Sequence, residues 1–511
     1  MLTLYTPLHG STVTAPTDIA GTLTGGDVAT YTLQLRSRAT GQETEADWQT
    51  LATGAAPVGV PGVPAVLGRI DPTLLRNGAY ELRVIAADLF GATTVFDGHS
   101  IVLDGGMKVG PFQLSFEDLN MPLVGIPVQL LRSYDSRGTS AADFGPDWEL
   151  GFRSVQVQTS DPVGEGWEDY VIRTVMGIPF YGIRPVRRHV VSVLVGDEVQ
   201  QFEAYSPTEQ GIFPPENASV AFRPINGSVG TLSLSEADAG NFCLSRSDDG
   251  VTLVDFVAIG ALDPEDWVYR TADGTRLDIR RVFGLRKLTD RNANSLTFTE
   301  DGITHSSGES VAFTRDAAGR ITAITAPGGV TLGYAYDEHG YLASFVNRAG
   351  ETNRFEYVPH PAAPGRRLLQ TIVDPLGNRA LAAGYDDDGR LVSQTDAAGN
   401  AVTFANDIPN RRQTVTDRLG NATVHEYDMR GNIVRTVDAL GNVTLRGYDE
   451  NDNEVSVTDP LGNVTTRTFD AKRNKLTETD PLGHTTSYTY DDAGNQLSSV
   501  DPLGRVTLNT Y

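Results

Sequence analysis

Apolar and polar side chains alternate with a period of two residues along most of the chain. The stretches Thr30–Arg36 and Tyr80–Ala86 place an apolar side chain at every second position, which is the pattern of a strand with one buried face. Strand-like runs recur at Val190–Val195 and Val251–Ile259, and no segment of useful length has helical periodicity. The pattern predicts an all-β protein.

From about residue 290 the alternation is organised into units of 21 residues (Tyr427 to Tyr448). An aromatic residue followed by aspartate marks one end of each unit, at Tyr427-Asp428, Tyr448-Asp449, Phe469-Asp470 and Tyr490-Asp491, and Tyr511 falls where the next is due. An Asp-x-x-Gly-Asn sequence or a near variant marks the middle, beginning at Asp396, Asp417, Asp438, Asp459, Asp480 and Asp501. The register persists upstream through Arg315-Asp316, Tyr336-Asp337, Tyr385-Asp386 and Asn406-Asp407, with an insertion around Pro359–Arg367. A fixed period over about nine units in residues 290–511 predicts a repeat architecture.

The two markers carry turn chemistry. Aspartate at the first position accepts hydrogen bonds from the backbone of its own turn, and glycine at the fourth supplies a positive φ. Turns starting at Asp428 and Asp438 bracket two strands of about five residues, so we expect a β-meander that reverses every 10 or 11 residues.

Two neighbouring columns of the repeat suggest which face is buried. One is always aliphatic, at Val434, Val455, Leu476 and Leu497, and the preceding one varies, at Ile433, Glu454, Lys475 and Gln496. Because adjacent side chains of a strand point to opposite faces, we predict a one-sided sheet with the aliphatic column buried. The aromatic residues are expected to stack in a column of their own.

Four regions are expected along the chain. Residues 1–104 are predicted to form a β-sandwich, in which Asn77 to Val102 resembles the last strands of bacterial immunoglobulin-like modules. Residues 105–160 lead into the repeats, and residues 161–268 are β-rich with degenerate repeats that we expect to continue the same sheet. Residues 269–511 hold the repeat array.

The lead-in and the repeats together carry a family resemblance. Arg132-Ser133-Tyr134-Asp135-Ser136, the later Gly145-Pro146-Asp147-Trp148 and the tandem units closely resemble Rhs/YD-repeat proteins, which are bacterial polymorphic-toxin scaffolds related to toxin-complex B and C components and to the YD shell of teneurins. The resemblance covers roughly residues 105–511. It implies a spiralling antiparallel sheet, a partial β-shell that in the family encloses a C-terminal toxin. The segment that closes the family's shell has no counterpart here, so we expect an N-terminal part of a longer protein, with toxin and true end downstream.

Charge and composition limit the classes of partner that the protein can bind. The formal net charge of -24 argues against a nucleic-acid partner, because phosphate binding needs a basic face. The longest aliphatic run, around Val190–Val195, is far short of a membrane span, and Met1–His9 is not a signal peptide. Cys243 is the only cysteine, so no intrachain disulfide is expected. The resemblance implies a secreted or cell-surface protein, exported without a visible N-terminal signal, whose partners are the toxin and secretion-system or cell-surface components.

Candidate chemistry is scarce. The eight histidines lack metal-ligand spacing, and Asn226–Gly230 lacks the spacing of a nucleophile elbow. Asp449–Asn453 begins like an EF-hand loop but fails at Glu454 and Pro460, and Asp386–Gly389 fails similarly. Most aspartates of the array are turn residues. We therefore predict no catalytic, cofactor-binding or metal-binding residue and a non-enzymatic scaffold, leaving weak calcium binding at acidic turns open.

Two other functions stay open. The chain is alternatively a cell-surface adhesin whose repeats bind carbohydrate, which an outward-facing aromatic column would favour. An enzyme within residues 160–268 is a third reading. We also expect self-association through residues 490–511, because an unpaired sheet edge is a template for other strands.

Overall fold

The structure is a computed structural model of the chain. It describes residues 2–23, 28–38, 48–55, 64–103, 105–138, 143–159, 162–186, 189–195, 198–207, 212–225, 228–235, 240, 242–247, 250–255, 260–281, 283–363, 365–470, 473–491 and 496–510. Strands, joined by turns and a few short 3-10 segments, make up this part of the chain, and it contains no α-helix, which confirms the all-β prediction. Tyr511, Asn226-Gly227 and parts of Ala56–Gly68 and Val251–Ile259 lie outside the described residues.

The N-terminal residues form two sheets that face each other across one core. The sheets have the orders β1 (Leu2–Thr6), β3 (Thr17–Leu23), β6 (Ala65–Ile70) and β2 (Thr12–Val13), β8 (Thr93–Leu103), β7 (Gly78–Asp88), β4 (Val28–Ser37), β5 (Gln49–Ala55). Ile19 and Leu67 from the first sheet pack with Leu33, Leu82 and Ile101 from the second, and all five are fully buried. Residues 2–103 are therefore a β-sandwich, and its immunoglobulin-like class stays a prediction.

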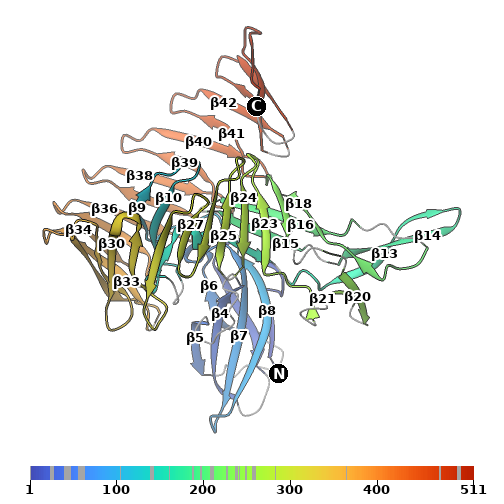
Figure 1. The fold of residues 1–511 in the computed structure, drawn as a ribbon, viewed down its shortest axis with the longest axis horizontal. Coiled ribbons are helices and arrows are strands. Elements are labelled where there is room, and N and C mark those ends of the chain that lie inside the picture. The colour runs from blue at the N-terminus through green and yellow to red at the C-terminus, as the bar shows by residue number, and fades with distance from the viewer. Residues whose placement is uncertain are drawn as a thin grey trace.

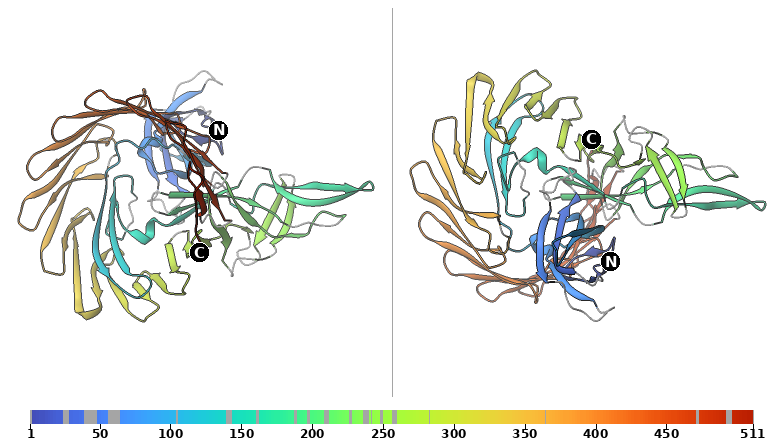
Figure 2. Two further views of the ribbon diagram at one scale, coloured as in Figure 1. Left: turned by 90° about the horizontal axis from the view of Figure 1, so that it is seen from above. Right: turned by 90° about the horizontal axis from the view of Figure 1, so that it is seen from below.

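The repeats form one continuous antiparallel sheet of 25 strands. Its strands pair in the order β19 (Thr231–Leu234), β23 (Asp266–Arg270), β24 (Arg276–Arg280), β25 (Gly284–Thr289), β26 (Ser295–Thr299), β27 (Gly302–His305), β28 (Ser310–Arg315), β29 (Ile321–Ala326), β30 (Val330–Tyr336), β31 (Leu342–Val346), β32 (Thr352–Pro359), β33 (Arg367–Val373), β34 (Arg379–Tyr385), β35 (Leu391–Asp396), β36 (Ala401–Asp407), β37 (Arg412–Thr416), β38 (Ala422–Tyr427), β39 (Ile433–Val437), β40 (Val443–Tyr448), β41 (Glu454–Thr458), β42 (Val464–Phe469), β43 (Lys475–Thr479), β44 (Thr485–Tyr490), β45 (Gln496–Val500), β46 (Val506–Leu508). From β23 each strand pairs with the next in sequence, which confirms the meander. Strands β32 and β33 are joined by a longer loop, as the insertion predicts. The sheet curls into an arc, and its last strands rise above its first (Figures 1 and 2).

The turns between these strands have the predicted chemistry. In the unit at Asp438, the carboxylate Oδ1 accepts from the backbone N–H of Leu440 at 2.9 Å and of Asn442 at 2.8 Å. Gly441 has φ 85°, a conformation that costs glycine nothing. The Asn442 side chain donates to the second oxygen of Asp438 at 2.8 Å, which explains the asparagine at the fifth position. The repeat motif is thus a self-contained turn.

The lead-in segment lies inside the arc. It forms a three-stranded sheet, β11 (Trp148–Leu150), β10 (Val128–Asp135) and β9 (Gln113–Met121), which Figure 2 shows enclosed by the curved repeat sheet. Its apolar residues share one core with strands β24–β35. The concave face of the repeat sheet is therefore covered over its first part.

Residues 156–261 do not continue the array. They form two separate sheets, with the orders β12 (Gln156–Thr159), β15 (Val190–Val195), β16 (Glu198–Tyr205), β18 (Ala221–Ile225) and β14 (Ile178–Pro185), β13 (Trp167–Val175), β21 (Gly250–Asp255), β20 (Phe242–Ser247), β17 (Asn217–Ala218), with β22 (Gly260–Ala261) beside β21. Of the described strands in residues 156–261, only β19 joins the long sheet, so the prediction that this region extends it is wrong. The region lacks the regular succession of Asp-x-x-Gly turns that makes each strand of the array pair with its successor. Hairpins such as β13–β14 and β15–β16 are therefore combined with pairings between strands that are not consecutive, such as β12 with β15 and β13 with β21.

The predicted buried column is also wrong. Leu476 and Leu497 are 36% and 40% exposed, whereas Leu342 and Leu391, which correspond to the variable column of the later units, are buried. The cause is a register shift at each Tyr-Asp step, such as that between Glu426 and Tyr427, where the partner strand carries an extra residue. The aliphatic position is this extra residue, and the bulge offsets the period-2 alternation by one position, so the aliphatic column does not mark the buried face.

Candidate functional site

The covered part of the concave face is built around one buried ion pair. Arg132 on β10 donates to Asp118 on β9, from Nε to Oδ2 at 2.7 Å and from Nη2 to Oδ1 at 3.0 Å. Their side chains are only 1% and 2% exposed. Tyr334 of β30 donates from its hydroxyl to Asp118 at 2.9 Å, so the pair is completed by the repeat sheet.

Aromatic rings surround the Arg132 guanidinium. The ring centroids of Phe116, Trp148, Phe345 and Phe355 lie 5.0, 4.8, 4.9 and 5.3 Å from its central carbon. Arg132 Nη1 has no hydrogen-bond partner, and it is therefore stabilised only by the negative faces of these rings. Two rings come from the lead-in and two from repeats, so the cage joins lead-in and repeats into one unit.

Glycines of the lead-in bring its backbone against the Tyr-Asp turns. The Gly106 N–H donates to the Arg430 carbonyl at 2.9 Å, and the Gly110 carbonyl accepts from the Leu391 N–H at 2.7 Å. A Cβ on Gly106 would stand 2.0 Å from the Arg430 oxygen, and one on Gly145 would stand 2.3 Å from the carbonyl oxygen of Gly340. The glycines are therefore required for close approach, and together they fix the spacing of turns from residue 340 to residue 430.

The tyrosines of the Tyr-Asp pairs lie on the concave face. There they are the cross-strand partners of buried residues, such as Leu342 for Tyr336 and Leu391 for Tyr385. Their hydroxyls donate to backbone carbonyls of the neighbouring strand, from Tyr357 to Leu342 at 2.9 Å, from Tyr448 to Ile433 at 3.2 Å and from Tyr490 to Lys475 at 2.9 Å. Ring contacts between successive members of this column do not occur among the described residues, so the expected stacking is wrong. The hydroxyl explains why the repeat favours tyrosine.

Beyond β35 the same face of the sheet becomes polar and open. Directly paired residues share a face, and the register carries that face through Gln394, Val402, Phe404, Val415, Gln413, His425, Thr436, Thr444, Arg446, Val457, Thr465, Arg467, Glu478, Thr486, Tyr488 and Ser499. Ions cross it as a chain: Arg446 lies 3.2 Å from Glu454, Arg467 pairs with Glu454, and Arg467 lies 2.9 Å from Glu478. The side chains of these four ion-paired residues are about one-third exposed. We call strands β36–β45 on this side the open inner face.

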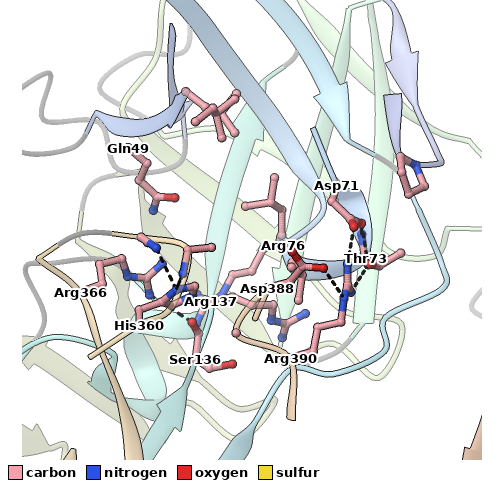
Figure 3. Close-up of a pocket in the computed structure, with 18 of the residues that line it drawn as sticks. Gln49, Asp71, Thr73, Arg76, Ser136, Arg137, His360, Arg366, Asp388 and Arg390 are labelled. Atoms are coloured by element: carbon pink, nitrogen blue, oxygen red, sulfur yellow. Dashed lines mark hydrogen bonds and ion pairs between the residues drawn. The ribbon is translucent and has the colours of Figure 1, made fainter. Parts of the chain in front are cut away.

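A cavity of about 1700 Å³ lies where the sandwich meets the lead-in and the Tyr-Asp turns (Figure 3). Arg390 from a turn donates to Thr73 of the sandwich at 2.7 Å and pairs with Asp71. Arg366 from the inserted loop donates to the Ser136 carbonyl at 3.1 Å. Each labelled arginine of this cavity therefore already has a partner within the chain, and we interpret the cavity as a structural joint.

Two carboxyl groups at this joint have pKa values shifted in opposite directions. Burial raises the pKa of Asp147 to about 7, although Arg366 Nη2 lies 3.0 Å from its Oδ1. Burial would also raise the pKa of Asp135, but the hydrogen bond from Arg137 and the charges of Arg76 and Arg137 lower it to about 2. Asp147 Oδ2 has no partner, which fits a carboxyl group that is partly protonated at neutral pH.

The two aspartates that begin sequences resembling calcium-binding loops, Asp449 and Asp386, form ordinary repeat turns. Asp449 Oδ1 accepts from the Asn451 and Asn453 N–H groups, both at 2.9 Å, as in any other turn of the array, and Asp386 accepts from its own turn likewise. No group of three or more His, Cys, Asp or Glu side chains is placed to hold a metal ion in the described ranges. Nor does the described part of the chain contain a helix long and apolar enough to cross a membrane. The ion pair of Arg132 and Asp118 was missed, although an arginine and an aspartate at alternating positions of two apolar strands were a signal.

The RHS Repeat family model matches residues 315–352, 448–481 and 472–506. A comparison with curated proteins finds no match. Solved structures similar to this chain include TcdB2-TccC3-TEV (10% identity, 84% of this chain and 22% of that chain, TM-score 0.31), TcdB2-TccC3 (10%, 84%, 28%, 0.35) and a Photorhabdus luminescens Tc holotoxin pore (12%, 90%, 26%, 0.27). The matched region spans about a quarter of the length of each of these three solved chains. Residues 315–352 and 448–506 thus contain RHS repeats, and they lie within the continuous antiparallel sheet.

Proposed function

We propose that the chain is a non-enzymatic wall segment of a β-shell, and that its open inner face encloses a polypeptide. The observation that carries this proposal is the change along one face of a continuous sheet. From β24 to β35 the face is apolar and covered by the lead-in, Phe404 of β36 still packs against that core, and the strands that follow are mostly polar and ionic on this face. A wall that adhered strongly to an enclosed chain would not release it, and a hydrated face of Thr, Ser and paired charges binds weakly.

The enclosed polypeptide is proposed to be a toxin carried further along the same protein, delivered in interbacterial competition or to a host. The RHS repeats support this assignment as a family expectation. The protein is accordingly proposed to be secreted or exposed at the cell surface, with secretion-system or cell-surface components as partners. The carbohydrate-binding alternative loses its main support, because the tyrosine column lies on the concave face with its hydroxyls bonded to the backbone.

Protease protection in protein purified from the cells that make it tests the proposal. A polypeptide outside residues 1–511 should remain with the shell and resist protease until denaturant opens the sheet. The matched control is the same polypeptide expressed alone, which should be digested at once. Equal digestion rates with and without the shell would contradict enclosure.

A further inference from the structure

A two-stranded arm projects from the body of the molecule. Strands β13 and β14 pair with each other along their whole length, and among the described residues the backbone of β13 pairs with a third strand only at Trp167, opposite Val251 of β21. Trp167 is buried, whereas the β13–β14 hairpin extends beyond the other strands of its sheet (Figures 1 and 2). An isolated hairpin gains little stability by itself, so this arm is not explained by the core.

The tip of the arm is apolar and exposed. Met176 is 99% exposed, and Val171, Val175 and Ile178 are between 46% and 49% exposed. Phe180 and Tyr181 are adjacent in β14 and therefore face opposite sides of the ribbon, so apolar side chains lie on both of its faces. A contact with one flat protein surface would use only one face, whereas a fluid apolar phase surrounds the tip from all sides.

The turn residue itself is an unusual choice. Met176 and Gly177 have φ 51° and 80°, the type I′ pattern of a two-residue hairpin, in which the first position ordinarily holds Asn, Asp or Gly. A long apolar side chain gains nothing in this strained position from the fold, because Met176 contacts almost nothing. Its place at the outermost point indicates a role outside the chain.

The outer part of the arm carries no negative charge. Between Tyr170 and Ile183 the sequence holds one arginine, Arg173, and no aspartate or glutamate, in a chain of net charge -24. The nearest carboxylates, Glu168 and Asp169, lie at the base and pair with Arg184 at 2.8 Å and Arg246 at 2.7 Å. Arg173, close to the tip, lies over the Phe180 ring at 5.1 Å and has no ion-pair partner in the described part of the chain.

We propose that the β13–β14 arm docks the protein on an anionic lipid surface, with Met176, Val175 and Ile178 entering the acyl boundary and Arg173 at the headgroup phosphates. Apolar burial and attraction of basic side chains to anionic lipid act together in this mode of binding. The arm is the part of this acidic protein that such a surface attracts, and its projection keeps the remaining negative charge away from the lipid.

Flotation of the full chain with phosphatidylcholine vesicles, with and without phosphatidylserine, tests the proposal. Wild type should float with the anionic vesicles and only weakly with neutral ones. Met176→Asn should lower binding about tenfold, because it removes the apolar tip, and should leave the turn intact, because Asn suits its positive φ. Arg173→Glu should lower binding roughly fivefold or more.

Matched controls separate the arm from general effects. Leu440→Asn removes a similarly exposed apolar side chain from a repeat turn, and Arg291→Glu reverses an exposed charge outside the arm. Both should float like wild type. Wild type that fails to float with anionic vesicles, or Met176→Asn that floats unchanged, would overturn the proposal. Self-association of the free protein that Met176→Asn abolishes, without vesicle binding, would assign the arm to a second copy instead.

Discussion

Arg132 and Asp118 form a two-point ion pair that is buried at the contact between the lead-in hairpin and the repeat sheet. The two strands carrying them pair with each other, and the repeats contribute the Tyr334 hydroxyl and two rings of the surrounding cage. The pair therefore reports whether lead-in and repeats form one folding unit.

Removing one partner of this pair should be strongly destabilising. Arg132→Met leaves Asp118 charged and buried, which costs roughly 3–5 kcal/mol of unfolding free energy. Adding Asp118→Leu should recover much of the loss, because no uncompensated charge then remains. Denaturant unfolding measures both. Arg435→Met, at the half-exposed pair with Glu426, is the control and should cost at most about 1 kcal/mol. A loss for Arg132→Met no larger than that of the control would refute the assignment.

A second prediction concerns the loss of stability when a glycine of the lead-in is replaced by alanine. Gly110 and Gly441 both have positive φ, at 91° and 85°, so alanine pays a similar backbone cost of about 1–2 kcal/mol at either site. A Cβ on Gly110 would also stand 2.6 Å from Arg390 Cβ, whereas one on Gly441 meets nothing. Thermal unfolding should therefore show a further loss of roughly 1–3 kcal/mol for Gly110→Ala alone. Equal losses at the two sites would show that the lead-in does not clamp the turns.

Asp147 predicts a pH dependence at the joint. Its pKa in the folded protein is raised to about 7 from an ordinary value of 3.8, so the folded state binds this proton more tightly than the unfolded state. The resulting stability is complete below pH 4 and is lost as pH rises to 7, with a slope of up to about 1.4 kcal/mol per pH unit. Asp147→Asn, which tolerates the positive φ of this residue, should abolish that slope.

The difference between wild type and Asp147→Asn is the readout, because burial lowers the pKa of His360 to about 4 and gives a slope of opposite sign in an overlapping window. Unfolding free energies measured from pH 5 to pH 8 should converge at the acidic end and diverge at the basic end, with the variant more stable there. Parallel curves would contradict a protonated Asp147.

The last strand predicts self-association. Strand β46 pairs only with β45 among the described residues, and Val506 and Leu508 on it are exposed. In an isolated chain of residues 1–511, the outer edge of β46 should pair with other copies, so sedimentation velocity of that chain should show concentration-dependent association. Lysine at both positions (Val506→Lys with Leu508→Lys) should reduce it. A chain that stays monomeric at all concentrations would contradict this expectation.

The repeat meander could be predicted from the sequence because its information is local. Each Asp438-type turn is complete within five residues, so period and turn type are visible in the letters. The buried face could not be predicted from the aliphatic column, because the bulge at each Tyr-Asp step depends on pairing between strands. The same holds for Gly106 and Arg430, whose contact joins distant parts of the chain.

The region before the array was predicted less well for the same physical reason. Alternation identified the strands β15 and β16, but nothing local selects β12 and β18 as their neighbours. The exposed tip at Met176 also has no local signature, since an apolar residue in a strand-like run reads as buried until its surroundings are known.

The most direct test of an enclosing inner face compares two adjacent residues of β40. Thr444 lies on the open inner face, and Leu445 points to the opposite side of the same strand. A photo-cross-linking amino acid is placed at either position in protein made by its own cells, and cross-linked peptides are identified by mass spectrometry. The account predicts that position 444 cross-links to a polypeptide outside residues 1–511 and that position 445 does not. Cross-links from 445 alone, or from neither position, would contradict it.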